Sequence, residues 1–322
     1  MNCEYLVTGG RGFIGNELVR QLKARGAPVA MLDDGSRVAP QIEDLQDVPL
    51  YRGDITETAY VRSVVHELKP RVVFHLAAIH FIPECNANPE RTLRVNVEAT
   101  LGLLRAASAA GVEHVVFASS GAVYADSPEP LNETAAVQPV DVYGWSKLQA
   151  EQLCRWHAGM EGLRITACRI FNNYGPRETN AHIVPEIVTQ LRNGDTLHLG
   201  NVTSRRDYVH TSDTARALRL LADQAAGAES FRVVNVGTGQ GASVEELVKT
   251  LAQQLGRDIA IVRDASRFRK ADKEVQVADV SLLKSLTAWS GPMAFQDGLR
   301  ALLEFEGLLP HRDQPAELTS PA

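Results

Sequence analysis

The stretch YLVTGGRGFIGNELVRQL, residues 5–22, decides the fold, because an apolar run, a glycine-rich turn and an amphipathic helix follow one another in it. The spacing G-x-x-G-x-x-G is met by Gly9, Gly12 and Gly15, and Gly10 adds the related G-x-G-x-x-G spacing. Glycine permits positive φ in such a turn, lets the backbone approach a pyrophosphate and allows close packing of strand and helix. The stretch therefore predicts a dinucleotide-binding turn, with a plain strand–helix turn as the alternative.

A carboxylate ends the second apolar run, VAMLDD at residues 29–34. Asp33, about 20 residues after the turn, would bind the adenosine ribose hydroxyls and repel a 2′-phosphate, so NAD is favoured over NADP. Arg37 nearby softens that preference. Asp54 and Ile55 follow a third apolar run and are candidates for contact with adenine, although surface capping explains Asp54 nearly as well.

Apolar runs and amphipathic stretches alternate along most of the chain, which is typical of a parallel sheet built from βαβ units. We therefore predict an α/β fold, a Rossmann-type doubly wound parallel sheet with a smaller α/β C-terminal substrate lobe. The predicted NAD-binding domain spans 1–171, and 205–240 returns to it. The lobe takes 172–204 and 241–312, and the polar tail 313–322 is expected to be mobile.

Composition limits the classes of partner. The chain has 322 residues, a net charge of −6 and a pI near 5.9, which gives no basic footprint for nucleic acid. No run approaches the roughly 18 apolar residues of a membrane span, and the N-terminus does not read as an export signal. Its four cysteines are scattered without metal-type spacing, so the sequence predicts no metal site and no disulfide framework, and it favours the cytoplasm.

A tyrosine and a lysine stand one helical turn apart in YGWSK, residues 143–147. Positions four apart share a helix face, so the Tyr143 hydroxyl and the Lys147 ammonium can reach one small volume. Ser120 ends the preceding apolar run, and ligands of open α/β sheets lie beyond such ends. A tyrosine base at neutral pH needs its pKa lowered from about 10 to about 7, roughly 4 kcal/mol. We predict Tyr143 as general base, Lys147 as its electrostatic support and Ser120 as a hydrogen-bond bridge, with chance spacing as the alternative.

Eight motifs follow one another along the chain: TGGRGFIG (8–15), HLAA (75–78), NVEAT (96–100), SSGAVY (119–124), YGWSK (143–147), RIFNNYGPR (169–177), RRDYVHTSD (205–213) and VVNVGTG (233–239). In this order they resemble the extended short-chain dehydrogenase/reductases, within them the nucleotide-sugar epimerase and dehydratase group, and UDP-glucose 4-epimerases in particular. The resemblance covers about residues 4–306. It is specific for the group and less so for its individual members.

The resemblance implies a mechanism. Members of the group hold NAD tightly, move a hydride from carbon 4 of a nucleotide-diphosphate sugar onto it, and in 4-epimerases return it to the other face of a transient 4-keto sugar. It also implies a homodimer that pairs the helices following residues 96 and 143. The residues expected to contact the cofactor are Gly9, Gly12, Phe13, Ile14, Gly15, Asp33, Asp54, Ile55, Ala77 and Lys147.

Three polar residues match the group's grip on a nucleotide diphosphate. Asn172 follows the sixth apolar run, and Arg206 and Arg269 match the phosphate-binding arginines, since guanidinium and phosphate form paired hydrogen bonds. Together with Ser120 and Tyr143, they are the residues expected to bind the substrate. Solvated surface arginines are the alternative, and Arg267 or Lys270 could replace Arg269.

Two small residues bear on the expected reaction. The group's 4,6-dehydratases carry an Asp–Glu pair, and its uronate decarboxylases a glutamate, where this chain has Gly121 and Ala122. Simple 4-epimerisation is therefore favoured, and a dehydratase or decarboxylase that uses His80 or Glu84 is the alternative. His80 is also a candidate for contact with a 6-hydroxyl or carboxylate of the sugar, and core packing explains it about as well. A ketoreductase would need an exchangeable cofactor, and a non-catalytic NAD sensor is disfavoured because the tyrosine and the lysine are both present.

Overall fold

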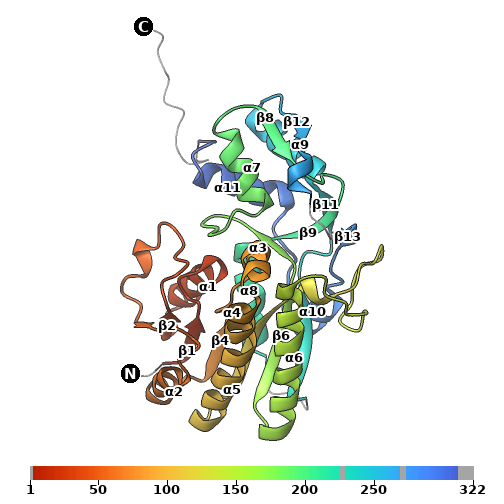
Figure 1. Ribbon diagram of the computed structural model, residues 1–322. Coiled ribbons are helices and arrows are strands. Elements are labelled where there is room, and N and C mark those ends of the chain that lie inside the picture. The colour runs from red at the N-terminus through yellow and green to blue at the C-terminus, as the bar shows by residue number, and fades with distance from the viewer. Residues whose placement is uncertain (1–2, 225–228, 269–272, 311–322) are drawn as a thin grey trace.

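The computed structural model describes residues 3–224, 229–268 and 273–310, and these form two layers (Figure 1). The larger layer is a sheet with helices on both faces. The smaller layer lies above the end of that sheet, and the chain passes between the two layers several times. The crevice between the layers is where a ligand of an open α/β sheet is expected.

A seven-stranded parallel sheet forms the centre of the larger layer, in the order β10-β6-β5-β4-β1-β2-β3. Its strands are β1 (Tyr5–Thr8), β2 (Val29–Asp33), β3 (Leu50–Arg52), β4 (Val72–His75), β5 (His114–Ser120), β6 (Arg164–Ile170) and β10 (Phe231–Val236). The strand order reverses between β1 and β4, and such a switch point opens a crevice beyond the carboxyl ends of the strands. The predicted doubly wound α/β fold is confirmed.

Helices cover both faces of this sheet, which explains why its central strands are apolar on both sides. One face carries α2 (Thr58–Leu68), α5 (Ala99–Ala110) and α6 (Val142–Glu161), and the other carries α1 (Phe13–Ala24), α8 (Thr211–Ala222) and α10 (Ser281–Leu286). Neighbouring residues of β5 serve different cores, because Val115 belongs to the core beneath α5 and Val116 to the core beneath α1. Among the helices of the described residues, none combines the length and the apolar character that crossing a membrane requires.

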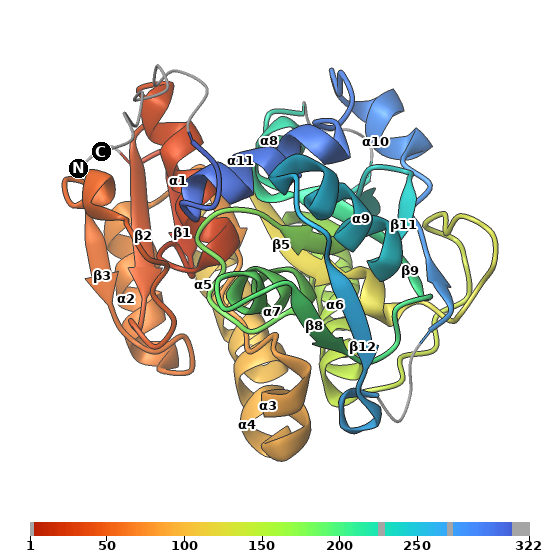
Figure 2. The same ribbon diagram turned by 90° about the horizontal axis from the view of Figure 1, so that it is seen from above.

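The smaller layer has a core of its own, in which Ile187, Leu247 and Leu299 from three helices are fully buried. Its elements are β7 (Asn172–Tyr174), α7 (Ile183–Leu191), β8 (Thr196–Leu199), β9 (Arg205–His210), β11 (Gly241–Ser243), α9 (Val244–Leu255), β12 (Ala260–Arg263), β13 (Val275–Gln276) and α11 (Phe295–Phe305). Strand β9 pairs with β7, β11 and β13, and β8 pairs with β12. Seen from above in Figure 2, α7, β8, α9 and α11 lie over the large sheet, so the lobe covers the crevice.

Two segments lie differently from the predicted boundaries. Within 205–240, β9 joins the lobe's sheet, and only α8 and β10 return to the large layer. Helix α10, predicted in the lobe, packs on β10 and buries Leu283 in the core of the large layer. Strand β10 is at the edge of the sheet, and without this cover its apolar side chains would face water. The predicted tail 313–322 lies outside the described residues.

The connection from β4 to α5 borders the crevice. It contains α3 (Ile82–Ala87), α4 (Pro89–Leu93) and a π-helical segment, Arg94–Glu98, that leads directly into α5. A π-helical turn inside an α-helix often marks a functional site. This one carries Asn96, a buried amide of the NVEAT motif.

Candidate active site

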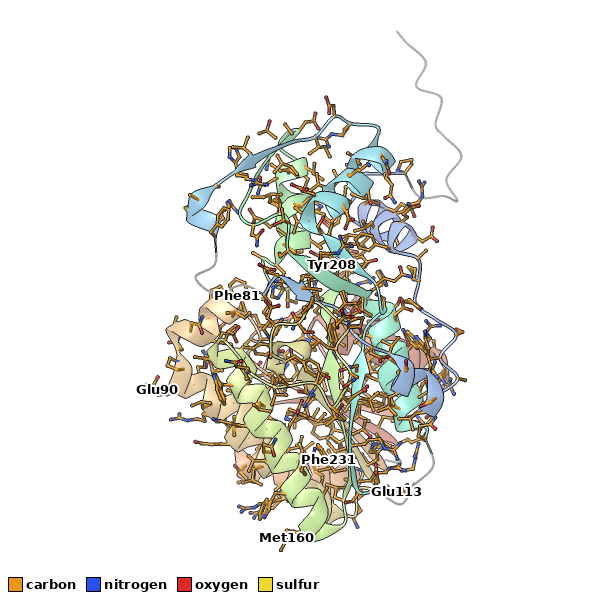
Figure 3. All side chains as sticks on the ribbon, turned by 90° about the vertical axis from the view of Figure 1, so that its right-hand side faces the viewer. Phe81, Glu90, Glu113, Met160, Tyr208 and Phe231 are labelled. Atoms are coloured by element: carbon orange, nitrogen blue, oxygen red, sulfur yellow. The ribbon has the colours of Figure 1, made fainter. Side chains whose placement is uncertain are left out.

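A cavity of about 570 Å³ lies between the two layers. Its walls come from the carboxyl ends of the strands, from the connection after β4 and from the lobe. Phe81 of the connection and Tyr208 of the lobe both line it, and Figure 3 shows them at the level where the two layers meet. Met160 lies at the opposite end of the molecule in the same view.

The cavity brings together nearly all the residues predicted for the site. Those that line it are Gly9, Gly12, Phe13, Ile14, Gly15, Asp33, Asp54, Ile55, Ala77, His80, Ser120, Tyr143, Lys147, Asn172 and Arg206. Arg269 and its alternative Lys270 lie outside the described residues. The other alternative, Arg267, forms an exposed ion pair with Glu186 at 2.8 Å in the lobe and is not among the lining residues.

In the glycine turn, the backbone at Gly9 lies closer to the backbone at Ala77 than a side chain on Gly9 would allow. Gly9 has a φ of +70°, and a Cβ atom there would stand 2.9 Å from the Ala77 amide nitrogen. A Cβ on Gly15 would stand 2.0 Å from the Gly9 carbonyl oxygen. Helix α1 starts directly after Gly12, so its first amides point into the cavity. This cradle of backbone donors at a helix N-terminus fits the pyrophosphate of a dinucleotide.

Asp33 at the end of β2 is held by two backbone amides. Its Oδ2 accepts from the Arg11 amide at 3.0 Å and its Oδ1 from the Gly35 amide at 2.8 Å. Burial raises the pKa of Asp33 above its usual value, and these hydrogen bonds counteract the effect. The carboxylate therefore has a fixed orientation at the cavity wall, as ribose binding requires. Asp54 caps its own turn by accepting from the Thr56 amide at 2.8 Å, and it also lines the cavity.

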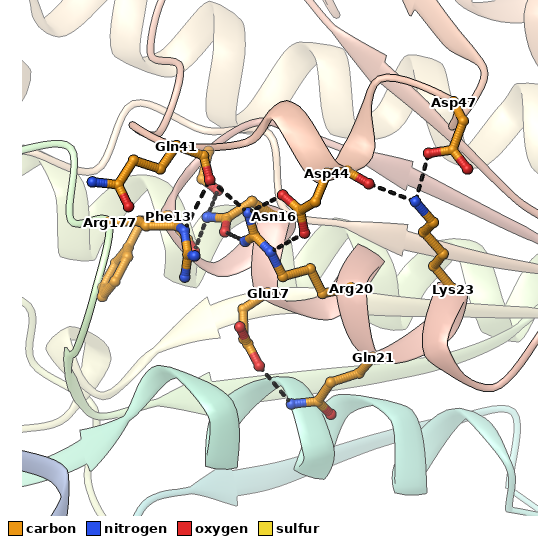
Figure 4. A network of polar contacts seen from close by, with 11 residues as sticks. Phe13, Asn16, Glu17, Arg20, Gln21, Lys23, Gln41, Asp44, Asp47 and Arg177 are labelled. Carbon is orange, nitrogen blue, oxygen red and sulfur yellow. Dashed lines mark hydrogen bonds and ion pairs between the residues drawn. The ribbon is translucent and has the colours of Figure 1, made fainter. Parts of the chain in front are cut away.

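The loop after β2, whose residues Ser36 and Arg37 line the cavity, is tied to α1 (Figure 4). Arg20 pairs with Asp44 at 2.7 Å, and Lys23 pairs with Asp47 at 2.5 Å. The Gln41 carbonyl accepts from Arg20 at 2.9 Å, and also from Arg177 Nε at 3.1 Å. The wall on the cofactor side is therefore fastened at several points to the helix that starts at the glycine turn.

Tyr143, Lys147 and Ser120 meet at the floor of the cavity. Asp141 caps α6 by accepting from the Gly144 amide at 2.8 Å, which sets the start of the helix beside the end of β5. Ser120 lies close enough to the Tyr143 hydroxyl to lower the pKa of the phenol, and both residues line the cavity. Lys147 lies one turn further on, with Nζ 5.9 Å from the centre of the Tyr143 ring, and donates to the Ala118 carbonyl at 2.8 Å. The structure thus places the three residues together as the sequence predicts.

The charges at this floor differ from the predicted state. Burial raises the pKa of the Tyr143 phenol above its usual range, and the nearby Ser120 offsets only part of the effect. Burial also lowers the pKa of Lys147 to about 8. The chain's own residues therefore hold the phenol protonated, and the lowering that a base needs must come with a bound positive charge.

Asn96 joins the connection after β4 to helix α6. Its Oδ1 accepts from the Ile79 amide at 2.9 Å, and its Nδ2 donates to the Ile79 carbonyl at 2.8 Å and to Ser146 Oγ at 2.9 Å. Both backbone groups of Ile79 and the residue before Lys147 are thus held by one buried amide. Asn96 is a positioning residue.

Buried cationic and polar groups face the part of the cavity beneath the lobe. Arg206 is 8% exposed and Lys273 is 7% exposed, and both line the cavity together with Asn172. Lys273 Nζ donates to the Ala122 carbonyl at 3.0 Å, and burial lowers its pKa. Sequence reasoning missed Lys273, although it lies only four residues beyond the predicted Arg269.

Three further polar residues, missed in the sequence, line the cavity from the segment between β7 and α7: Glu178, Asn180 and His182. Glu178 Oε1 accepts from the amides of Thr179 at 2.8 Å and Asn180 at 3.1 Å, and Asn180 Nδ2 donates to His80 Nε2 at 2.9 Å. Burial raises the pKa of Glu178 to about 7 and lowers that of His80 to about 4. No local spacing signals them, since tertiary structure alone brings this segment opposite His80.

A family model, that of the NAD dependent epimerase/dehydratase family, matches residues 5–237. The chain belongs to this family. Membership confirms the resemblance found in the sequence and confirms NAD as the cofactor. The glycine turn and Asp33 are the residues that fit NAD here.

Relatives in the NAD-dependent epimerase/dehydratase family differ in their reactions. The chain is 32% identical over 314 residues to GDP-6-deoxy-D-mannose reductase of Pseudomonas aeruginosa, which covers 94% of this chain and 97% of the relative. It is 31% identical over 310 residues to UDP-glucose 4-epimerase of Streptomyces lividans, covering 90% and 92%. A solved structure, MoeE5 in complex with UDP-glucuronic acid and NAD, has a TM-score of 0.83 and 32% identity, covering 94% and 98%. Membership of the family therefore does not by itself specify the reaction, which depends on the residues of this protein's own site.

Proposed function

We propose that this protein is an NAD-dependent nucleotide-sugar 4-epimerase. The observation that carries the proposal is that Tyr143, Ser120 and the buried Lys147 line the same cavity, with Lys147 Nζ 5.9 Å from the centre of the Tyr143 ring. The next residues, Gly121 and Ala122, also line the cavity and bring no carboxylate to the reacting carbons. A site with one base and no acid at this position favours a reaction that leaves the mass of the sugar unchanged.

The residues divide the work as follows. NAD, when bound, accepts a hydride from carbon 4 of the sugar and returns it. Tyr143 takes the proton of the 4-hydroxyl, Ser120 bridges that hydroxyl and the phenol, and Lys147 stabilises the phenolate and holds the ribose. The proton goes back from Tyr143 after the keto sugar has turned its other face to the floor.

The nucleotide diphosphate is assigned to the lobe side. Arg206 and Lys273 are buried cations that line the cavity, and Asn172 adds an amide beside them. Burial lowers the pKa of Lys273, and a diphosphate would oppose that shift because its negative charge favours the protonated amine. Charge-assisted hydrogen bonds to phosphate supply the affinity.

Dehydration on the same scaffold is the second candidate, and Glu178 is the observation that favours it. With a pKa of about 7, this carboxyl group is partly protonated near neutral pH and lines the same cavity. It could donate a proton to a leaving hydroxyl, the role that Gly121 and Ala122 cannot fill. Glu84, the replacement considered from the sequence, is paired with Arg37 at 2.6 Å.

The test is incubation of the purified protein, without added reductant, with a panel of UDP-, dTDP-, GDP- and CDP-sugars that includes UDP-glucuronate. Products are followed by mass spectrometry and NMR. A 4-epimer of unchanged mass supports the proposal, and loss of water or carbon dioxide contradicts it. If water is lost, Glu178→Gln should abolish the loss, and Glu186→Gln, which changes a carboxylate outside the cavity lining, serves as its matched control. Turnover only with added NADH or NADPH would identify a ketoreductase.

We also propose a homodimer in the cytoplasm. Helices α5 and α6 lie side by side on the outer face (Figure 1), and Trp145, Trp156 and Met160 of α6 are 50%, 52% and 69% exposed. Such large apolar side chains favour burial against a second copy. All four cysteines are free and buried, which suits a reducing compartment. Light scattering should give twice the chain mass, and Trp156→Lys should give the monomer.

A further inference from the structure

A cluster of three side chains joins the connection after β4 to the lobe. One nitrogen or oxygen atom from each of His80, Glu178 and His182 lies within 4.8 Å of the other two. The two imidazole rings have their centres 5.7 Å apart. All three side chains line the cavity, and none of them takes part in the steps assigned to Tyr143.

The donors are already oriented. His80 Nε2 accepts from the Asn180 amide at 2.9 Å, so its lone pair faces the lobe segment. Glu178 Oε1 accepts hydrogen bonds from two backbone amides, which leaves the lone pairs of Oε2 for a metal ion. His182 stands at the start of α7, and its side chain does not cap that helix.

We propose that His80, Glu178 and His182 bind a divalent transition-metal ion, with Zn²⁺ as the favoured ion, and that its open coordination position faces the sugar. Two histidines and one glutamate form a ligand set of zinc sites that keep a position for substrate. The statement about the sugar rests on the proposed function, whereas the metal site itself does not. The sequence predicts no metal site, because that expectation considered cysteine spacing and not residues brought together by folding.

The geometry requires a small contraction. Ligand atoms of a tetrahedral ion with bonds of about 2.1 Å stand about 3.4 Å apart, so the present cluster has to close by at most about 1.4 Å. The Asn180 amide gives up its hydrogen bond to His80 in doing so.

The proximity to the reacting centre comes from the same contacts. Lys147 lies near enough to His80 for its charge to affect the imidazole, and both line one cavity. A metal at this place would bind a hydroxyl pair or a carboxylate of the hexose while Tyr143 acts on carbon 4. The ion would thus select sugars by their oxygen substituents rather than perform the hydride step.

The first experiment uses the metal alone. The full-length protein is stripped with a chelator, titrated with ZnCl₂ by calorimetry at pH 7.5, and its zinc content is measured after dialysis. We expect one Zn²⁺ per chain, with affinity reduced at least 100-fold in His182→Ala and Glu178→Gln and unchanged in His198→Ala, which removes an exposed histidine of β8. NAD binding by each variant checks its folding. Absence of stoichiometric binding, or equal binding by all variants, overturns the metal site.

The second experiment tests the open position. Co²⁺ replaces Zn²⁺, and its visible absorption is recorded before and after the nucleotide sugar that the panel identifies, or UDP-glucose if none turns over. A changed spectrum supports contact between metal and sugar, and an unchanged spectrum overturns that contact. Zinc binding without turnover would refute the proposed epimerase activity and leave the metal site standing. Turnover without zinc binding would refute the metal site and leave the epimerase activity standing.

Discussion

The two ends of the cavity are built in different ways. At the cofactor end, the decisive contacts are made by backbone atoms of one contiguous turn, in which Gly9 lies against Ala77 and Asp33 is held by two amides. At the end that we propose for the sugar, side chains from separate segments converge, such as His80 after β4 and Glu178 before α7. The cofactor site can therefore be predicted from a short sequence motif, whereas the substrate site cannot.

The largest effect is expected at the floor between the two ends. Tyr143→Phe should lower kcat about 10²- to 10⁴-fold, because the substrate loses the group that takes its proton. NAD affinity should stay unchanged, since the cofactor end is built from other residues. Tyr60→Phe is the matched control, as the same hydroxyl is removed outside the cavity lining. Steady-state kinetics and NAD titration decide, and substantial activity left in Tyr143→Phe would refute its role as the base.

A pair of glycines tests whether close backbone approach defines the cofactor end. Gly9 and Gly26 share a φ of +70°, but only Gly9 has atoms near its missing Cβ, and Gly26 has none within 4 Å. Gly26→Ala should reduce the free energy of unfolding by about 1–2 kcal/mol through backbone strain alone. Gly9→Ala should reduce it by about 3–4 kcal/mol and weaken NAD binding, since the Ala77 backbone is also displaced. Urea unfolding that gives equal losses would show that the clash is relieved without penalty.

Replacement of Lys147 by an apolar residue should stabilise the folded protein and abolish its activity. Its pKa falls from an ordinary 10.5 to about 8 in the folded protein, so below pH 8 the charged lysine destabilises that state by up to about 3 kcal/mol. In Lys147→Met, the lost hydrogen bond to the Ala118 carbonyl offsets about 1 kcal/mol. The variant should therefore be inactive and about 2 kcal/mol more stable at pH 7.

The sign of the pH dependence of stability follows from the numbers of protons that the folded and the unfolded protein bind. Between pH 8 and 10.5 the unfolded chain keeps the Lys147 proton that the folded protein has lost, so wild-type stability rises relative to Lys147→Met. Urea unfolding of both proteins at pH 7 and pH 10 measures this difference. An advantage of the variant that stays constant with pH would contradict the assigned pKa.

The smallest effect is expected at the ribose contact. Asp33→Asn should weaken NAD binding about 10-fold, because hydrogen bonds to a charged acceptor contribute about 1.5–3 kcal/mol each and an amide retains part of them. Asp47→Asn is the control, since Asp47 pairs with Lys23 outside the cavity lining. Calorimetric titration with NAD and with NADP compares the two variants. Equal losses would place the adenosine elsewhere along the wall.

The sequence predicts those parts of the fold and of the site that are formed by residues close together in the chain. The glycine turn, Asp33 and the Tyr143–Lys147 pair are motifs of neighbouring residues, and all of them line the cavity. Lys273 and His182 could not be read in this way, because their place is set by how the lobe folds over the sheet. The same holds for β9, whose partners come from three different parts of the chain.

Ionisation was harder to foresee than position. The spacing of Tyr143 and Lys147 predicts a lowered phenol pKa, but burial of the ring acts in the opposite direction and dominates in the chain alone. Burial is a property of the whole fold, so a pair of residues in a motif does not reveal it. The same cause lowers the pKa of Lys147, which the motif leaves unforeseen as well.

The buried amide of Asn96 bears on how such an enzyme acquires new substrates. It holds the peptide of Ile79, directly before His80, and it also holds Ser146, directly before Lys147. The sugar-facing segment and the catalytic helix thus share a common point of attachment. Residues beyond that point can diverge during evolution without disturbing the alignment of the base. One scaffold can in this way be inherited by enzymes that act on many different sugars.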